Sequence, residues 1–336
     1  MSDLIGRKVT VEVPASSANL GPGFDCLALA LDMWLRVTVE AVDGEDSWQG
    51  VGEAEGLSFG GDNRCLHGLM AGFSEMESRP RPALRVQMDS SIPMGRGLGS
   101  SAAATVAGLV AGQTLTDARL DRLLNRAALI EGHPDNASAA ILGGFVIVTQ
   151  ERVTRFDVPP SLRIVVFVPE RQLATADMRA VLPEHVRLTD AALNAAAVGG
   201  IVAAFASGSL AGLSAVSDDR LHEPYRAAEY PELPKLKRAA IEAGAIGAAL
   251  SGAGSSVIAL CTTETVAAVH AAFDEASQQL LPGSVSQLAP SREGTLVDGR
   301  ALDRDVITRG YAESGGLVEL RYRPDEDEIR RRVLEE

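Results

Sequence analysis

The sequence is short of lysine and cysteine, and it begins without an apolar leader. Only three lysines, Lys8, Lys235 and Lys237, occur among its 336 residues, so a nucleotide site in this chain would depend on arginine, backbone amides and metal. Three scattered cysteines are too few for a disulfide framework or a zinc site, which indicates a reducing compartment. The opening residues lack the apolar core of a signal peptide. We therefore expect a cytoplasmic protein.

Positive charge is scarce in the chain as a whole. The formal net charge of −14 argues against nucleic-acid or membrane-surface partners, because both require a basic face. The net negative charge does not exclude an anionic small ligand, since a binding site can be locally positive. Residues 191–217 carry no charge, but they consist mostly of alanine, glycine and serine. We expect two buried helices there rather than a membrane span, which needs about 20 strongly apolar residues.

The arrangement of apolar residues predicts a two-domain α+β protein. Apolar residues make up 46% of the chain, which excludes a disordered protein. Strand-like and helix-like segments mix without strict βαβ alternation. The pattern restarts after two prolines at 159–160, and the residues after about 298 have strand-like and helix-like pieces of their own. We expect domains over residues 1–158 and 159–298, followed by a C-terminal extension over 299–336 whose role the sequence does not define.

Three helices can be predicted in some detail. One follows directly on the glycine-rich loop described next, and a second covers roughly residues 117–131. A third, near residues 264–276, places Val266, Val269, Phe273 and Ala276 on one face.

The segment "PMGRGLGSSAAATVAGL", at residues 93–109, places a glycine-rich loop between a predicted strand and a predicted helix. Glycine allows φ > 0 and close approach of the backbone to a ligand. The start of the helix offers unpaired N–H groups and partial positive charge, and Ser100 and Ser101 add hydroxyls. The loop has neither the lysine of a P-loop nor the spacing of a dinucleotide fingerprint. Two interpretations therefore stand on these residues alone, a phosphate cradle and a tight structural turn.

Three further segments, at residues 13–31, 131–144 and 250–260, are dense in glycine, asparagine, aspartate and serine beside apolar strands. Together with the loop, and in the same order, they resemble the motifs of the GHMP kinases, and of the homoserine kinase family in particular. The resemblance implies an N-terminal ribosomal-protein-S5-like domain and a C-terminal ferredoxin-like α/β sandwich, with the active site between them. It also implies transfer of phosphate from ATP, with Mg²⁺, to the side-chain hydroxyl of L-homoserine in threonine biosynthesis. Members of this family are often homodimers.

The resemblance assigns ATP to the glycine loop and to one residue outside it, near the adenine. The predicted ATP-binding residues are Pro93, Met94, Gly95, Arg96, Gly97, Leu98, Gly99, Ser100, Ser101, Ala102, Ala103 and Asn63. It also makes Glu131 a Mg²⁺ ligand, with Ser100, or less favourably Ser101, as the second protein contact. Magnesium prefers such hard oxygen ligands. On position alone, Glu131 at a helix end would be a solvated surface charge.

Two pairs of residues are predicted to bind the acceptor. Asn19 and Asp25 flank a Gly-Pro-Gly turn, and from the residues alone they form an Asx-turn pair; the resemblance places them at homoserine, with Asp25 at its ammonium group. Arg179 and Arg226 match family motifs that also contain Thr175 and His222. A planar guanidinium can bind a carboxylate through two hydrogen bonds, which is the role that the resemblance gives to both arginines, with Thr175 beside them.

The run "HPDN" supplies the predicted catalytic residue. The resemblance implies that His133 contacts the substrate and that Asn136 occupies the position of a catalytic aspartate in related kinases. An amide cannot accept a proton near neutral pH, so catalysis by Asn136, Glu131 and Ser100 would rest on positioning and charge neutralisation. Asp135 is the alternative base. Gly254, in the turn at 252–254, is expected to pack beside the phosphate loop and to border the substrate.

Three other functions compete with this hypothesis. The first is a GHMP kinase with a different alcohol acceptor, and the second is a kinase-like fold kept for binding alone. The third, a dinucleotide-dependent oxidoreductase, is disfavoured by the loop spacing.

Overall fold

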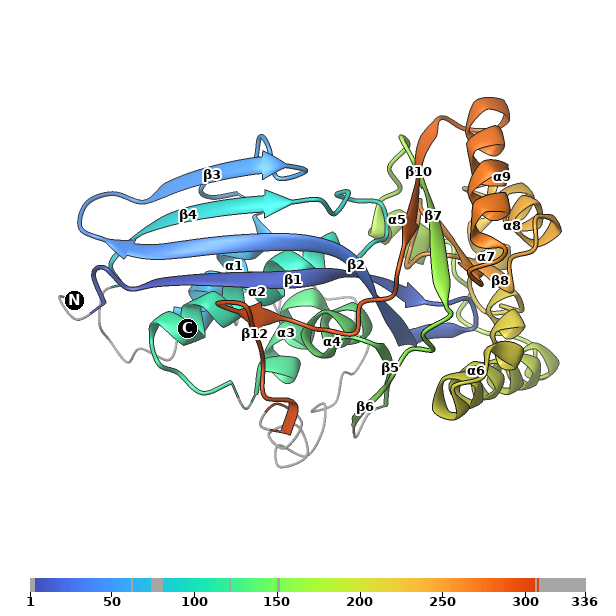
Figure 1. Cartoon of the computed structure of the whole chain (residues 1–336), viewed down its shortest axis with the longest axis horizontal. Coiled ribbons are helices and arrows are strands. Elements are labelled where there is room, and N and C mark those ends of the chain that lie inside the picture. The colour runs from blue at the N-terminus through green and yellow to red at the C-terminus, as the bar shows by residue number, and fades with distance from the viewer. Residues whose placement is uncertain are drawn as a thin grey trace.

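Two β-sheets organise the chain in the computed structural model, which describes residues 4–61, 63–73, 81–120, 122–149, 152–305 and 307 (Figure 1). The strands of the larger sheet are β1 (Lys8–Asn19), β2 (Gly23–Val42), β3 (Ser47–Gly52), β4 (Ala83–Ser90), β5 (Phe145–Val148), β6 (Val153–Phe156), β11 (Leu296–Val297) and β12 (Arg300–Ala301). Their order is β12-β11-β1-β2-β4-β3, with β5 paired to β2 and β6 to β5. All these pairings are antiparallel except β3 with β4.

Alternating apolar residues explain the inner strands of this sheet. In β4, Leu84, Val86 and Met88 are buried while the residues between them are exposed, as expected for a strand with one face on the core. The helices on that face are α1 (Arg64–Phe73), α2 (Ser100–Leu115), α3 (Leu123–Glu131) and α4 (Asp135–Leu142). Helix α2 is almost wholly buried, which its small alanine and glycine side chains allow.

The second sheet has the order β10-β7-β9-β8 and is antiparallel throughout. Its strands are β7 (Arg163–Pro169), β8 (Gly247–Leu250), β9 (Val257–Cys261) and β10 (Gly283–Leu288). The other helices that the structure describes are α5 (Thr175–Ala180), α6 (Leu188–Ser207), the 3₁₀ helix η1 (Leu210–Ser217), α7 (Glu223–Arg226), α8 (Leu233–Glu242) and α9 (Val266–Gln279). Helices α8 and α9 cover this sheet, which gives the β-α-β-β-α-β order of ferredoxin-like domains. The predicted fold class is confirmed.

The predicted helices have mixed outcomes. Val266, Val269, Phe273 and Ala276 are the buried residues of α9, as predicted. The helix predicted from residue 117 begins only at Leu123 in α3, because Asp117 has φ 56° and belongs to the turn that follows α2. The "HPDN" run, for which no helix is predicted from the sequence, contains the first residues of α4, Asp135 and Asn136.

The C-terminal part of the described chain returns to the first sheet. Strand β11 pairs with β1, at Val11 with Val297, although it lies inside the second unit expected from the sequence. Ile307 is 1% exposed and belongs to the core cluster of the first sheet, so at least this residue after 299 packs on the first unit. The boundaries 1–158, 159–298 and 299–336 stay a prediction. At the C-terminal end the contacts cross them, because β11 and Ile307 both pack on the first unit. Residues 308–336 lie outside the described part.

Helix α6 is the one helix of the described residues that is long and apolar enough to cross a membrane, by length and composition only. Only 28% of its apolar window is buried. It packs through one stripe that includes Ile201 and Phe205, and Phe205 stacks on Phe145 with ring centroids 3.9 Å apart. The expectation of two buried helices is therefore wrong for α6, which lies at the outer edge of the molecule (Figure 1).

Contact between α1 and α2 depends on glycine, which yields a stability prediction. A Cβ atom added at Gly108 would lie 1.9 Å from the carbonyl oxygen of Cys65, a backbone atom that cannot give way without moving α1. We expect Gly108→Ala to lower the free energy of unfolding by about 3 kcal/mol. Gly199→Ala in α6 is the control, since nothing lies within 4 Å of that position. It should raise stability by roughly 0.5–1 kcal/mol, because alanine is the better helix former.

Denaturant unfolding followed by circular dichroism measures both variants. Equal changes in the two would contradict the packing argument.

Candidate active site

The glycine loop ends at an open helix start. Gly95, Gly97 and Gly99 have φ of 65°, 77° and 71°, values that side chains with a Cβ rarely adopt. Gly99 is the N-cap of α2 and brings no side chain that could accept from the first N–H groups. Those donors and the partial positive charge of the helix start remain for an anion. The geometry favours the phosphate cradle over a merely structural turn.

Arg96 holds this loop against the second sheet. Its guanidinium donates to three carbonyl oxygens, from Nε to Pro169 at 2.8 Å, from Nη1 to Met94 at 3.0 Å and from Nη2 to Glu170 at 2.7 Å. Arg96 thus fixes the shape of the loop through its side chain, a role that the sequence did not indicate.

The turn at 252–254 and its flanking serine also contact the loop, as predicted. Ser251 Oγ lies 2.7 Å from the Gly97 carbonyl oxygen, and a Cβ added at Gly97 would lie 2.1 Å from the Ser251 carbonyl oxygen. Gly254, with φ 96°, completes the turn. The absence of a side chain at Gly97 is what allows the two sheets to share this site.

Glu131 at the end of α3 faces the first turns of α2. Its Oε1 accepts from Ser101 Oγ at 3.1 Å and from Thr105 Oγ1 at 2.5 Å. The structure thus places Ser101, the less favoured of the two predicted serines, against Glu131, and the role of Ser100 stays a prediction. Thr105 was missed, although its four-residue spacing from Ser101 places both on one helix face.

These oxygens fit a magnesium ion. In the part of the chain that the structure describes, no three His, Cys, Asp or Glu side chains form a group that could hold a metal. One carboxylate and serine hydroxyls beside a phosphate site are nevertheless a donor set that Mg²⁺ accepts, because it takes much of its coordination from water and phosphate oxygens.

Asn136 lies beside the start of α2. Its Oδ1 accepts from Ser16 Oγ at 2.8 Å, which orients the amide. A Cβ added at Gly99 would lie 3.2 Å from the same Oδ1 and 2.2 Å from Ser16 Oγ. The predicted catalytic amide and the phosphate cradle are therefore neighbours, and Ser16 is a supporting residue that the sequence did not reveal.

His133 and Asp135 form an ion pair at the start of α4. His133 Nδ1 lies 3.0 Å from Asp135 Oδ1. The same oxygen accepts a hydrogen bond from the backbone N–H of Asn136 at 2.7 Å. Burial acts to lower the pKa of His133, but Asp135 outweighs it through a hydrogen bond and its charge and raises the pKa to about 9. Burial acts to raise the pKa of Asp135, but His133 and the Asn136 amide hold it below its ordinary value. An ionised, doubly hydrogen-bonded Asp135 is a weak proton acceptor.

The segment from Asn19 to Asp25 forms a strained loop. Both residues have positive φ, 69° and 55°, a conformation that asparagine and aspartate tolerate best. The Asp25 amide donates to Asn19 Oδ1 at 3.0 Å, so the Asx-turn interpretation holds in part. Asn19 Nδ2 donates to the Gly252 carbonyl oxygen at 2.9 Å, which ties this loop to the turn of the second sheet.

Asp25 and Arg179 meet across 154 residues of sequence. Arg179 Nη1 donates to Asp25 Oδ2 at 3.1 Å and Nη2 donates to Oδ1 at 2.9 Å. The two side chains are 24% and 25% exposed, respectively. The guanidinium carbon also lies 5.7 Å from the centre of the Phe24 ring.

Arg226 is 1% exposed, and its guanidinium carbon lies 5.5 Å from the centre of the same Phe24 ring. Its Nε donates to the Met178 carbonyl oxygen, and its Nη1 donates to the Gly252 carbonyl oxygen and to His222 Nδ1, all at 3.0 Å. Burial, and next the charge of Arg179, lower the pKa of Arg226 to about 10, so it stays charged at neutral pH.

His222 supports Arg226 as a neutral ring. Burial lowers the pKa of His222 to about 4. Its Nε2 lies 2.7 Å from the Gly21 carbonyl oxygen, which can only accept, so Nε2 carries the proton and Nδ1 accepts from Arg226. In the sequence His222 was identified only as part of a family motif. In the structure its ring links the Asn19–Asp25 loop to Arg226.

Two further predicted residues are Thr175 and Asn63. Thr175 is the first residue of α5 and is exposed. Asn63 is 3% exposed and caps α1, since its Oδ1 accepts from the amides of Cys65 and Leu66. Its assignment to the adenine stays a prediction.

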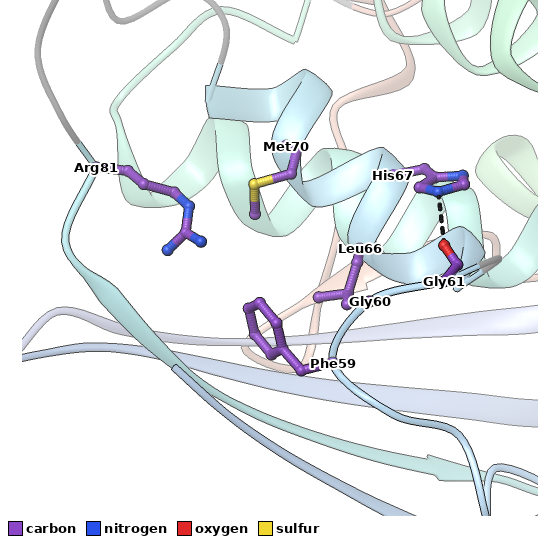
Figure 2. A pocket seen from close by; sticks show the side chains of 7 residues that line it. All are labelled: Phe59, Gly60, Gly61, Leu66, His67, Met70 and Arg81. Carbon is purple, nitrogen blue, oxygen red and sulfur yellow. Dashed lines mark hydrogen bonds between the residues drawn. The ribbon is translucent and has the colours of Figure 1, made fainter. Parts of the chain in front are cut away.

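A pocket of about 280 Å³ lies between α1 and the segment before it (Figure 2). Phe59, Leu66 and Met70 give it an apolar wall, and Arg81 stands at its rim with its guanidinium hydrogen-bonded to Asp46. None of the predicted site residues line it. The chemistry described above lies at the start of α2, outside this pocket.

Comparisons with known proteins agree with this geometry. Residues 65–144 match the family described as GHMP kinases N terminal domain, and residues 201–278 match GHMP kinases C terminal. A homoserine kinase of Synechococcus sp. is 40% identical over 79% of this chain and 90% of its own length, and one of Moorella thermoacetica is 39% identical over 85% and 99%. The crystal structure of homoserine kinase from Cytophaga hutchinsonii superimposes with a TM-score of 0.76 at 28% identity, covering 86% of this chain and 97% of that one.

The His133–Asp135 pair predicts a pH dependence of stability. The folded pKa of His133, about 9, exceeds its unfolded value of about 6.5, so the stabilisation is complete below pH 6.5 and is lost as the pH rises through 9. The group contributes about 3 kcal/mol at most to that fall. We expect His133→Gln to lack this part of the slope when urea unfolding is measured from pH 6 to pH 10.

His270→Gln is the matched control, because His270 and Asp274 pair on α9 at positions where both side chains are partly exposed and an ion pair contributes little to stability. It should keep the wild-type slope. A wild-type slope in His133→Gln as well would show that the pair does not titrate as described.

Proposed function

Because the chain belongs to the GHMP kinases, and to the homoserine kinases among them, we propose that it transfers the γ-phosphoryl group of ATP to the side-chain hydroxyl of L-homoserine. The products are ADP and O-phospho-L-homoserine, an intermediate of threonine biosynthesis. One observation carries this proposal. A carboxylate and two guanidinium groups, on Asp25, Arg179 and Arg226, gather around Phe24. Such a set suits an amino acid, and the Gly252 turn links it to the phosphate loop.

We assign the triphosphate to the loop at 93–103, where the backbone N–H groups of the open α2 start act as donors. Arg96 and Ser251 keep that loop in one shape, so little ordering is needed when the nucleotide binds. The assignment of Asn63 to the adenine rests on the resemblance alone.

Magnesium belongs to the same proposal. Glu131 would hold it, together with the hydroxyl of Ser100 or Ser101. When bound, Mg²⁺ neutralises negative charge on the phosphate oxygens. Ser101 and Thr105 orient Glu131, so its carboxylate faces the start of α2.

The acceptor hydroxyl needs an orienting group, and Asn136 supplies it in this proposal. Ser16 occupies Oδ1, which leaves the amide to present its Nδ2 donor elsewhere. An amide cannot remove a proton, and the lowered pKa of Asp135 makes that carboxylate a poor base. Catalysis therefore rests on positioning and charge neutralisation, which suits a loose phosphoryl-transfer transition state.

Location and assembly stay predictions. The net charge of −14 supports an enzyme without nucleic-acid or membrane partners, and the scarcity of cysteine supports a cytoplasmic location. A homodimer is proposed from the resemblance alone, and size-exclusion chromatography with light scattering measures it.

The acceptor is tested by ADP release with ATP, Mg²⁺ and one alcohol at a time. We expect kcat/KM for L-homoserine to exceed that for mevalonate, galactose and shikimate at least 100-fold. Preference for another alcohol would make the chain a GHMP kinase of different specificity. Absence of turnover with all four would support a binding protein instead.

Glu131→Gln tests the proposed metal ligand. Removing one charged contact that acts on the transferring phosphoryl group should lower kcat by roughly 10²–10³ while the circular dichroism spectrum stays unchanged. Thr105→Val is the matched control, since it removes only the hydrogen bond that orients the same carboxylate. Its loss should be much smaller. Near-normal kcat of Glu131→Gln at saturating Mg²⁺ would remove Glu131 from the site.

A further inference from the structure

A buried carboxylate that the proposed mechanism does not use begins the short helix that carries Arg226. Glu223 is the first residue of α7 and is 5% exposed. Its Oε1 accepts from the backbone N–H of Leu250 at 2.6 Å, and its Oε2 accepts from the ammonium group of Lys237 on α8. Burial raises the pKa of Glu223, and the charge and hydrogen bond of Lys237 act against that rise. Both oxygens of this carboxylate are therefore used inside the protein.

Glu223 connects two elements of the proposed acceptor site. It begins α7, which ends at Arg226. Its Oε1 holds the last residue of β8, Leu250, and the turn at 251–254 follows directly. In that turn the Gly252 carbonyl oxygen accepts from Nη1 of Arg226 at 3.0 Å. A shift of Glu223 against Leu250 would therefore separate the guanidinium from its acceptor.

Helix α7 needs such external support. A single helical turn has little stability of its own, because nucleation fixes several residues for one hydrogen bond. Asp219 shapes the turn from within, since its Oδ2 accepts from the backbone N–H groups of His222 at 3.0 Å and Glu223 at 2.6 Å. Lys237 also donates to the Ser217 carbonyl oxygen at 3.3 Å, which ties α8 to the end of η1. The Glu223 side chain then sets the position of α7 on β8.

We propose that Glu223 is a positioning residue for the acceptor: its hydrogen bond to the Leu250 amide sets where Arg226 stands, and Lys237 serves as its counter-charge. The inference rests on the proposed function for the role of Arg226. The contact that positions the helix is one acceptor for one N–H group. An uncharged acceptor of the same shape therefore suffices once Lys237 is removed as well.

Two double variants that both lack the ion pair separate the hydrogen bond from the charge. Glu223→Gln with Lys237→Met keeps an oxygen that can accept from Leu250, and Glu223→Met with Lys237→Met does not. Phosphorylation is measured on the full chain with L-homoserine and ATP varied in turn. We expect KM for homoserine to stay within about threefold of wild type in the first variant and to rise about tenfold or more in the second.

The other kinetic constants should change much less. Arg96 holds the glycine loop separately, so KM for ATP should stay within about threefold of wild type in both variants. Arg226 is assigned to the carboxylate of homoserine, away from the hydroxyl that reacts, so kcat should fall less than KM rises. A general loss of stability would not separate the two Michaelis constants in this way.

Asp46 and Arg81 offer a matched control. Asp46 Oδ1 accepts from the backbone N–H of Leu84 at 2.8 Å and the carboxylate pairs with Arg81, which is the same arrangement at the start of β4. Asp46→Met with Arg81→Met should lower the free energy of unfolding and leave KM for homoserine unchanged. An equal rise of KM in this control would reduce the effect to lost stability and overturn the proposal.

Glu223→Asp covers the case in which circular dichroism shows that the Glu223→Met double variant does not fold. It keeps the charge beside Lys237 but shortens the side chain by one methylene, so KM for homoserine should rise about fivefold or more. An unchanged KM in Glu223→Asp would contradict the proposal.

The outcomes separate this inference from the proposed function. Wild type that does not phosphorylate homoserine contradicts the function, and the inference falls with it. Wild type that does so, with equal KM for homoserine in the two double variants, overturns the inference alone, whether both values are normal or both are raised.

Discussion

The close contact between Gly97 and the Ser251 carbonyl is the constraint on which the rest of the site depends. No side chain fits between the glycine loop of the first sheet and the turn of the second. Because the backbones touch, the Gly252 carbonyl can accept from both Asn19 and Arg226, two residues assigned to the acceptor. A phosphate cradle and an amino-acid site are thereby held together by main-chain geometry, without a long connecting side chain.

Charge in this site is organised by pairing. In a chain of net charge −14 with three lysines, the three arginines of the cluster have distinct roles. Arg96 donates to backbone carbonyls, Arg226 is buried on carbonyls and a neutral histidine, and Arg179 faces Asp25. The positive charge available to a ligand is therefore less than a count of arginines suggests, and its direction is set by the partners of each side chain.

Much of the fold could be predicted because the spacing of apolar residues along a helix or strand indicates which of its residues are buried. The apolar face of α9 and the alternation in β4 followed directly from the sequence. The site could be predicted only as a list of residues, since their partners depend on how distant segments meet. No spacing indicates that Asp25 pairs with Arg179, or which tautomer His222 adopts. For a related reason the sequence could not show which serine bonds to Glu131, because the rotation of α2 against α3 places the hydroxyl of Ser101 there.

The return of the chain to its first sheet has a consequence for synthesis. Strand β1 ends at residue 19, but its partner β11 begins only at residue 296. At about 5–20 residues per second, the ribosome needs roughly 15–60 seconds to add the residues between them. Until then one edge of β1 has no strand to pair with, and such an edge is open to pairing with other chains. The nascent protein therefore has to protect this edge of β1 until β11 has been synthesised.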